Sequence, residues 1–530
     1  MAKGPDHVKS DITCNAATES PDRSNNNNIA MGLERHKTAV SRIAQSIRGF
    51  YERREPFRIN HGSTNSTRPI RRTHEVDISD LRNVLRVDAA TRTALVEPNV
   101  PMDRLVEATL KHGLVPPVVM EFPGITAGGG FAGTAGESSS FRHGFFDRTI
   151  NYVEMVMADG TVMKVSEGEN GDLFRGAAGA VGTLGVTTLM ELQLVEAKKF
   201  VKATYHPHRS VKESITGVHT QTLNDANDYV DGILYGPEHG VVVAGEMTDD
   251  MPDTAKVQTF SRAWDPWFYL HVKDKTRGSH PVTDYIPLAE YLFRYDRGGF
   301  WVGRAAFHYF HFPFNRVTRW LLDDFMHTRM MYKALHASGE SSRFIIQDLA
   351  LPYANAEKFI DFTSEKLGIW PLWLCPLKQS PAPTFHPHSA VESPGITPDQ
   401  ILNIGVWGFG PKDKQQFITA NRELEHRLRE LGGMKWFYAH TYYGEDEFWD
   451  MYDREWYDGL RQKYNATTLP SVYDKIKIDV EADRKELQES WRRKTKSVWP
   501  VGGLWGIKKA IDSKEYQIHR NSTWKWNNIY

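Results

Sequence analysis

Glycines and hydroxyl side chains crowd residues 121–144, which read EFPGITAGGGFAGTAGESSSFRHG and hold seven glycines and five serines or threonines. Glycine has no Cβ atom, so such a run lets the backbone approach a ligand and lets N–H groups converge on an anion. A diphosphate joined to a planar ring system needs both properties. The alternative is a loop whose glycines only turn the chain, because glycine motifs alone give many false matches.

Two further loops of small and polar residues favour a ligand-binding interpretation. Residues 58–69 (RINHGSTNSTRP) offer hydrogen-bond donors and positive charge, and residues 176–185 (GAAGAVGTLG) lead into a strand expected over 186–194. Between these loops, residues 154–165 are rich in apolar side chains on both sides of Asp159-Gly160, which predicts a β-hairpin with a two-residue turn. Three such loops on one α+β scaffold are more than is needed to turn the chain between its elements, which favours a binding role for them.

The glycine spacing argues against the commonest dinucleotide-binding fold. A nicotinamide-type fingerprint needs G-x-G-x-x-G between a strand and a helix, with an acidic residue about 20 positions further on. Here the glycines follow Pro123 and precede three serines, Ser138–Ser140, and not an apolar helical stripe. No G-x-x-x-x-G-K-[ST] phosphate loop is present either.

Three motifs in this order resemble the flavin-binding module of the vanillyl-alcohol-oxidase (VAO) type, also called the PCMH-type FAD domain. They are HGSTNS at 61–66, TAGGGFAGTAGESSS at 126–140 followed by His143-Gly144, and GTLG at 182–185. Within that superfamily the chain is most similar to the Δ24-sterol reductases, the seladin/Diminuto group. That likeness is carried by VEP at 96–98, AKKFVK at 197–202, IWPLWLCP at 369–376 and EFWDMY at 447–452, and it spans about 41–475.

The resemblance implies an α+β protein with a VAO/PCMH-type FAD domain at 33–198. A cap or substrate domain would cover 199–480, with its C-terminal part returning to the flavin, and 481–530 would be an extension. FAD would be bound by three groups of residues: His61, Gly62, Ser63, Thr64, Asn65 and Ser66; Thr126, Ala127, Gly128, Gly129, Gly130, Gly133, Thr134, Ala135, Gly136, Glu137, Ser138, Ser139, His143 and Gly144; and Gly182, Thr183 and Gly185. His61 is either a covalent tether or a hydrogen-bond donor to the diphosphate.

The resemblance also implies a reaction, the NADPH-dependent reduction of a side-chain carbon–carbon double bond in a sterol or a related terpenoid. An isolated alkene has no carbonyl to accept charge, so the site needs a proton donor, an apolar sleeve and a reductant. We expect Tyr442 to donate the proton, with His440 and Tyr443 as rivals. Alternatives are an FAD-dependent oxidase of an apolar molecule and a non-catalytic sterol-binding flavoprotein.

Composition excludes several other classes. The 530 residues carry a net charge of −1, which argues against nucleic acid as a partner. Only Cys14 and Cys375 are present, so no disulfide framework is expected, and the 21 histidines form no H-E-x-x-H motif, so no metal is indicated.

The N-terminus shows neither a signal peptide nor a membrane span, whereas animal and plant sterol reductases carry an N-terminal anchor. We expect residues 1–32 to be a disordered tail, followed by a helix over 33–54. The protein is expected to be cytoplasmic or peripheral at the endoplasmic reticulum membrane. The aromatic and basic stretch 310–319 is a candidate for membrane contact.

Overall fold

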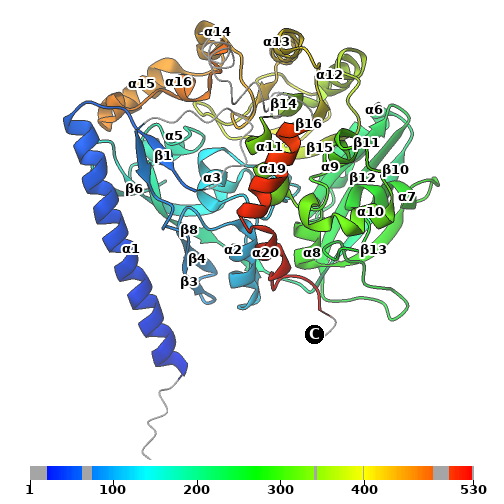
Figure 1. Ribbon diagram of the computed structural model, residues 1–530, viewed down its shortest axis with the longest axis horizontal. Helices are drawn as coiled ribbons and strands as arrows, with labels where there is room; N and C mark the ends of the chain where they lie inside the picture. The colour runs from blue at the N-terminus through cyan, green and yellow to red at the C-terminus, as the bar shows by residue number, and fades with distance from the viewer. Residues whose placement is uncertain (1–20, 63–73, 340–342, 398, 481–499, 528–530) are drawn as a thin grey trace, which may run out of the picture.

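The computed structural model describes residues 21–62, 74–339, 343–397, 399–480 and 500–527, which form two α+β domains side by side (Figure 1). The first domain contains a five-stranded antiparallel sheet in the order β3-β4-β8-β6-β7. Its strands are β3 (Val84–Asp88), β4 (Thr93–Val96), β8 (Val186–Gln193), β6 (Ile150–Val156) and β7 (Val162–Ser166). Strand β8 confirms the expected strand over 186–194.

The predicted hairpin is present as β6 and β7, but its turn is longer than two residues. Val156 pairs with Val162, and Met157 N donates to Thr161 O at 2.8 Å, which leaves Ala158, Asp159 and Gly160 in the loop. Gly160 has φ +84°, a left-handed conformation that glycine adopts without steric cost. The loop is therefore the three-residue type with glycine in the left-handed position.

Helices and short strand pairs complete the first domain. Helix α2 (Met102–Leu110) buries its apolar face. Helix α3 (Ala127–Ala132) lies within the glycine-rich run, and its cap Thr126 accepts a bond from Gly129 N. Two small sheets pair β1 (Arg58–Asn60) with β2 (Glu75–Asp77), and β5 (Leu114–Val115) with β9 (Val195–Glu196).

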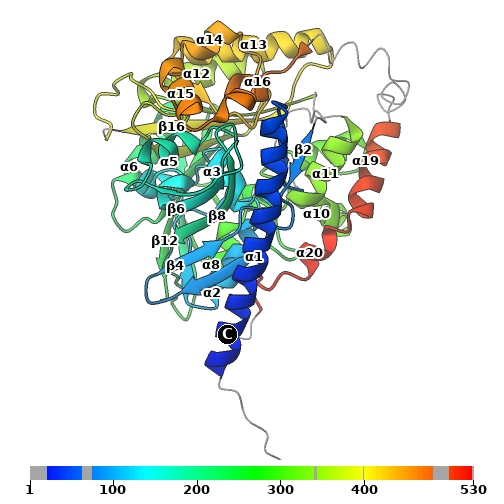
Figure 2. The same cartoon turned by 90° about the vertical axis from the view of Figure 1, so that its left-hand side faces the viewer.

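The N-terminal helix α1 is longer than the sequence predicts. It runs from Pro21 to Glu52 along the outside of the first domain (Figures 1 and 2), so the expected disordered tail is wrong for residues 21–32. Val40, Ile43 and Ile47 are buried against the domain. The first turns of α1 are polar and gave no helical pattern in the sequence. They are helical because packing of the later turns against the domain stabilises the whole helix.

The second domain is built on an eight-stranded antiparallel sheet in the order β13-β10-β12-β11-β15-β16-β14-β17. Its strands are β13 (Val282–Pro287), β10 (Phe200–His208), β12 (His239–Thr248), β11 (Tyr229–Gly236), β15 (Leu372–Lys378), β16 (Gln400–Phe409), β14 (Phe344–Leu351) and β17 (Met434–Lys435). Helices α6 (Val211–Thr222), α12 (Tyr353–Lys366) and α13 (Lys414–Glu430) pack their apolar faces on one side of this sheet. The alternate side chains of β14, β15 and β16 point to the other side, which faces the first domain.

The chain after β17 returns to the first domain, where α14 (Glu445–Trp449), α15 (Arg454–Lys463) and α16 (Val472–Ile476) lie (Figure 1). Tyr457 donates to Thr183 Oγ1 at 2.7 Å, and Lys475 Nζ donates to Val181 O at 2.5 Å. The C-terminal helix α19 (Val501–Asp512) then packs beside α11 (Thr328–Ser338), and α20 (Tyr516–Arg520) lies at the start of α11, where the ring of His519 contacts that of His327. The last segment touches both domains, because Glu107 accepts from Thr523 N and Glu290 accepts from Trp526 N.

Candidate active site

A cavity of about 350 Å³ lies between the two domains, and both contribute to its wall. The first domain supplies parts of the three loops singled out in the sequence. The second domain supplies side chains from the inner face of its sheet and from the segment after β17. Ligand pockets commonly form where domains meet in this way.

Many of the predicted cofactor residues line this cavity, and the loops meet although they are far apart in the chain. The lining members are His61, Thr126, Gly128, Gly129, Gly133, Ala135, Gly136, Gly182 and Gly185. The other described candidates are not among the residues that line it: Gly62, Ala127, Gly130, Thr134, Glu137, Ser138, Ser139, His143, Gly144 and Thr183. Ser63, Thr64, Asn65 and Ser66 lie outside the described residues.

The glycines of the cavity wall divide into two kinds. A Cβ atom at Gly128 would lie 2.6 Å from Pro98 Cβ, and one at Gly136 would lie 2.5 Å from Leu377 Cδ2, so packing excludes side chains there. At Gly129, by contrast, an added Cβ would meet Thr126 Oγ1 at 3.1 Å. Apart from its chain neighbours and the backbone of its own helix, no other described atom lies within 4 Å of that position. A side chain at Gly129 would therefore fill cavity space that a bound group needs.

The charge at one end of the cavity suits an anionic group. Lys475 lines the wall and is held against the 176–185 loop through Val181 O. His61, which is exposed, also lines the cavity. A diphosphate would find a cation and backbone of the three loops here, and a flat ring system would find the surface around Gly129. The residues present therefore fit FAD.

The opposite part of the wall is aromatic. Its side chains come from both domains and include Phe122, Phe300, Tyr332, Trp373, Trp407 and Trp436. The rings of Phe300 and Trp407 are 4.6 Å apart between centroids, and Phe122 packs edge-on against both. This wall provides a sleeve for an apolar molecule.

Two carboxyl groups, Glu121 and Glu137, share one buried position at the cavity. Both side chains are buried, and Glu121 lines the cavity. Burial raises the pKa of each group, and the nearby Glu121 carboxyl raises the pKa of Glu137 further. Glu121 Oε1 and Glu137 Oε2 have no hydrogen-bond partner among the described residues. The pair is therefore a buried acid that faces the cavity.

A buried ion pair lies next to these carboxyl groups. Arg294 binds Asp231 Oδ2 at 3.0 Å, and the same oxygen accepts from Tyr295 and Trp373 at 2.8 and 3.0 Å. Arg294 is 1% exposed, so its charge is compensated inside the protein. Since Arg294 already neutralises Asp231, the two glutamates are left to share a proton.

A second acid reaches the cavity from strand β14. Asp348 accepts from Tyr438 at 2.7 Å and from Asn403 at 3.1 Å, and all three side chains line the cavity. Burial raises the pKa of Asp348 and raises the pKa of Tyr438 well above its usual range. The phenol proton of Tyr438 is thus committed to Asp348.

The three predicted catalytic residues, Tyr442, His440 and Tyr443, do not line this cavity. Tyr442 packs against the apolar cluster under α12 and α13, and its backbone N–H donates to Glu425 at 2.9 Å. His440 contacts Phe417 in that same region, and Tyr443 is buried above Lys435. From the same segment, Trp436 and Tyr438 do line the cavity, but the chain turns away before residue 440.

Sequence reasoning missed Glu121 and Asp348 as candidate acids. Glu121 opens the glycine-rich run, but its neighbours gave no sign that it would be buried against Glu137. The sequence did contain a sign of Asp348, because this acid interrupts the apolar strand FIIQDLAL. An acidic side chain buried in such a strand is expected to have a hydrogen-bonding partner.

Comparison with known proteins agrees with this geometry. Residues 38–166 match the family model of an FAD binding domain. The chain is 29% identical over 415 residues to the Delta(24)-sterol reductase of Homo sapiens, which covers 77% of this chain and 78% of that protein. It is 28% identical over 451 residues to the Delta(24)-sterol reductase of Arabidopsis thaliana, covering 79% of each, and 28% over 420 residues to the Delta(24)-sterol reductase homolog dhcr-24 of Caenorhabditis elegans.

The fold, the cavity and the family model together define a flavoprotein with an α+β FAD-binding domain, an FAD-dependent oxidoreductase. Along three quarters of its length the chain is similar to Delta(24)-sterol reductases of animals and plants, which confirms the resemblance seen in the motifs.

Proposed function

We propose that this protein reduces a side-chain carbon–carbon double bond of a sterol or a closely related terpenoid, with FAD as cofactor and NADPH as reductant. The observation that carries the proposal is the cavity, in which an aromatic sleeve and a protonated carboxyl pair face the loops that fit FAD. The similarity to sterol reductases supplies the substrate class.

Different residues of the chain contribute to the addition of two hydrogens across an alkene. FAD held by the loops at 126–140 and 182–185 would, once reduced, be the source of the hydride that one alkene carbon receives. Phe300, Trp407 and their aromatic neighbours exclude water and hold the apolar side chain in place. Glu121 donates the proton to the other alkene carbon, which leaves tertiary cation character on the carbon that receives the hydride. Glu137 and Glu121 are then left with one proton fewer, which solvent restores.

Glu121 is preferred to Tyr438 as the proton donor. Both line the cavity, but the Tyr438 proton is held by Asp348 and its pKa is raised well above the usual range. The carboxyl pair keeps a proton because two adjacent buried carboxylates cannot both ionise. It therefore holds a transferable proton under conditions where an isolated carboxyl group would have lost it.

One anaerobic experiment tests the function. NADPH is added to the yellow protein and flavin absorbance is followed, and desmosterol is then added. We expect bleaching by NADPH and recovery of the oxidised spectrum on adding the sterol, with the saturated side chain as product. Recovery on admitting air alone, with no sterol product, would instead show an oxidase. Sterol binding without bleaching by NADPH would show a non-catalytic flavoprotein.

We also propose that the protein contacts an anionic membrane through a basic–aromatic patch, defined as Trp264, Phe312, Val317, Trp320 and Leu321 with Arg316 and Arg319. Helix α10 (Arg316–Leu321) has no buried residue, and Leu321 is 71% exposed. Arg316 lies over Trp264 at 4.6 Å from the ring centroid. Arginine beside exposed tryptophan and leucine suits a surface of acidic headgroups over acyl chains.

The patch continues toward the C-terminal helices. A Cβ atom at Gly503 would lie 2.5 Å from Tyr309 Cε1, which shows how closely α19 approaches α9 (Gly303–Tyr309). Exposed Leu504 and Trp505 on α19 extend the apolar surface, and α10 and α19 lie on the same side of the molecule (Figure 2). Within the part of the chain that the structure describes, every helix is too short or too polar to cross a bilayer.

A further inference from the structure

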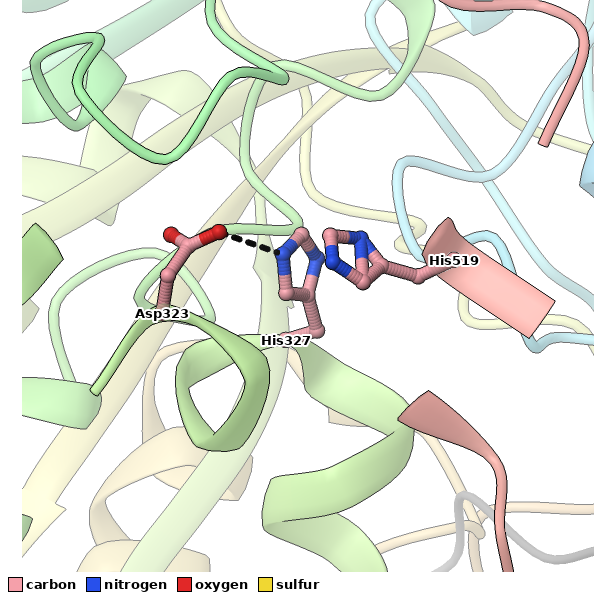
Figure 3. Close-up of side chains that lie close together, drawn as sticks. All are labelled: Asp323, His327 and His519. Carbon is pink, nitrogen blue, oxygen red and sulfur yellow. Dashed lines mark ion pairs between the residues drawn. The ribbon is translucent and has the colours of Figure 1, made fainter. Parts of the chain in front are cut away.

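Three side chains outside the cavity lie close together where the C-terminal extension meets the second domain: Asp323 faces His327, and the His519 ring lies beside the His327 ring, at 3.4 Å between ring centroids (Figure 3). Asp323 begins the short helix η2 (Asp323–Met326), His327 immediately precedes α11, and His519 lies on α20. One potential ligand atom from each lies within 4.8 Å of the other two. Because almost two hundred residues separate His519 from the other two, no sequence motif marks the group.

The Nε2 atom of His327 is the first indication of a missing ligand. His327 is 3% exposed, and Nε2 has no hydrogen-bond partner among the described residues. Asp323 Oδ2 lies 3.5 Å away, which is long for a hydrogen bond of about 2.7–3.2 Å. Two ligands held about 2.1 Å from a tetrahedral metal ion are about 3.4 Å apart. The observed separation therefore fits a metal ion between the two atoms.

Neighbouring groups hold both ligands in the orientation that a metal ion requires. Asp296 Oδ2 binds Nδ1 of His327 at 2.5 Å, so Nε2 is the nitrogen left to face Asp323. Arg297 Nε donates to Asp323 Oδ1 at 2.8 Å, which leaves Oδ2. A carboxylate behind a ligating histidine is the usual support of a zinc site, because it fixes the tautomer and the ring.

We propose that Asp323, His327 and His519 bind one Zn²⁺ ion that fastens α20 to the start of α11. Two imidazoles and one carboxylate suit zinc better than magnesium or calcium, which prefer oxygen ligands. Water would complete a tetrahedral set. The ion would be structural, since none of the three residues lines the cavity between the domains.

The competing account has no metal. Lys525 Nζ lies 3.3 Å from His519 Nδ1, and Arg297 is close, so these cations already supply positive charge. A protonated His327 would then lie between Asp296 and Asp323. The two accounts differ in metal content, in the effect of zinc on thermal stability and in the role of His519.

The test uses the full-length flavin-loaded protein, stripped with a chelator and titrated with Zn²⁺. We expect about one zinc per chain by elemental analysis and a rise in Tm on adding zinc. His519→Gln and Asp323→Asn should weaken zinc binding at least about tenfold, since changes even to supporting groups cost 10- to 100-fold. His426→Gln is the matched control, because His426 is exposed on α13 and pairs with Glu430 one turn along the same helix. Flavin content reports whether each variant is folded.

A second measurement needs no variant. Co²⁺ added to the stripped wild-type protein should give the intense visible absorption of a tetrahedral histidine site in the difference spectrum, and zinc should displace it. If stripped wild-type protein takes up neither ion, or if His519→Gln and Asp323→Asn bind zinc as the wild type does, the proposal is wrong and the protonated-histidine account holds.

Discussion

At the scale of a single residue, the proposed chemistry depends on Glu121. Its carboxyl group lines the cavity, and the buried carboxyl of Glu137 is its neighbour, so the pair can present a proton to a substrate. General acids of this kind work best when burial has moved their pKa upward.

Replacing Glu121 by Gln should preserve shape and remove the acid. We expect Glu121→Gln to bind FAD and to be bleached by NADPH normally, yet to reduce a Δ24-sterol about 10²- to 10⁴-fold more slowly, the usual cost of a lost general acid. Stopped-flow absorbance and product analysis measure the two half-reactions separately.

Two tyrosine variants act as controls for this prediction. Tyr442→Phe, away from the cavity, should turn over at the parental rate. Full activity in Glu121→Gln together with a slow Tyr438→Phe would transfer the donor role to Tyr438.

Gly129 tests the placement of the cofactor. Gly129→Val puts two methyl groups into cavity space, so flavin content should fall at least about tenfold, because a side chain blocks the close approach of the backbone. Gly168→Val is the control, since nothing lies within 4 Å of an added Cβ there. Absorbance of the purified proteins gives the flavin-to-protein ratio, and full flavin content in Gly129→Val would contradict the placement.

Helix α1 is fastened to the first domain by a buried ion pair, which is a property of the whole element. His36 Nδ1 lies 2.9 Å from Glu97 Oε1, and Nε2 lies 3.1 Å from Glu154 Oε1. Burial alone would lower the pKa of His36, but its hydrogen bonds to Glu154 and Glu97 outweigh burial and raise the pKa to about 9.

A raised histidine pKa stabilises the folded state in a defined pH range. The stabilisation is complete below the unfolded value of about 6.5 and is lost as pH rises through about 9. The Tm advantage of the wild type over His36→Gln should therefore shrink between pH 6.5 and 9.5, as scanning calorimetry can measure. An advantage of His36 that grows with pH would refute the assignment.

At the scale of the whole molecule, α10 and α19 place exposed apolar and basic groups on one side. Trp320→Glu with Leu321→Glu should weaken binding to vesicles containing phosphatidylserine at least about tenfold, because burying each large apolar side chain contributes about 1.5–3 kcal/mol. Leu223→Glu, an exposed leucine on the second domain outside the patch, is the control. Co-sedimentation measures binding, and equal binding to pure phosphatidylcholine would remove the charge argument.

The sequence by itself determined the cofactor module and the broad architecture. Loops at 126–140 and 182–185, the strand β8 and the helix α2 follow from local glycine patterns and periodicity, and these depend on residues close together in the chain. The motif order was specific enough to indicate the flavoprotein family and the substrate class.

Tertiary structure alone decided which acids face the cavity and what lies beside the C-terminus. Glu121 meets Glu137 because α3 and its flanking loops fold back on themselves, and Asp348 meets Tyr438 because β14 lies beside the segment after β17. Asp323, His327 and His519 meet because α20 lies at the start of α11, where His519 contacts His327. No local pattern encodes such contacts, since burial and partner choice depend on elements that the chain brings together from far apart. That is why Tyr442, predicted as the proton donor, lies away from the cavity that Glu121 and Tyr438 line.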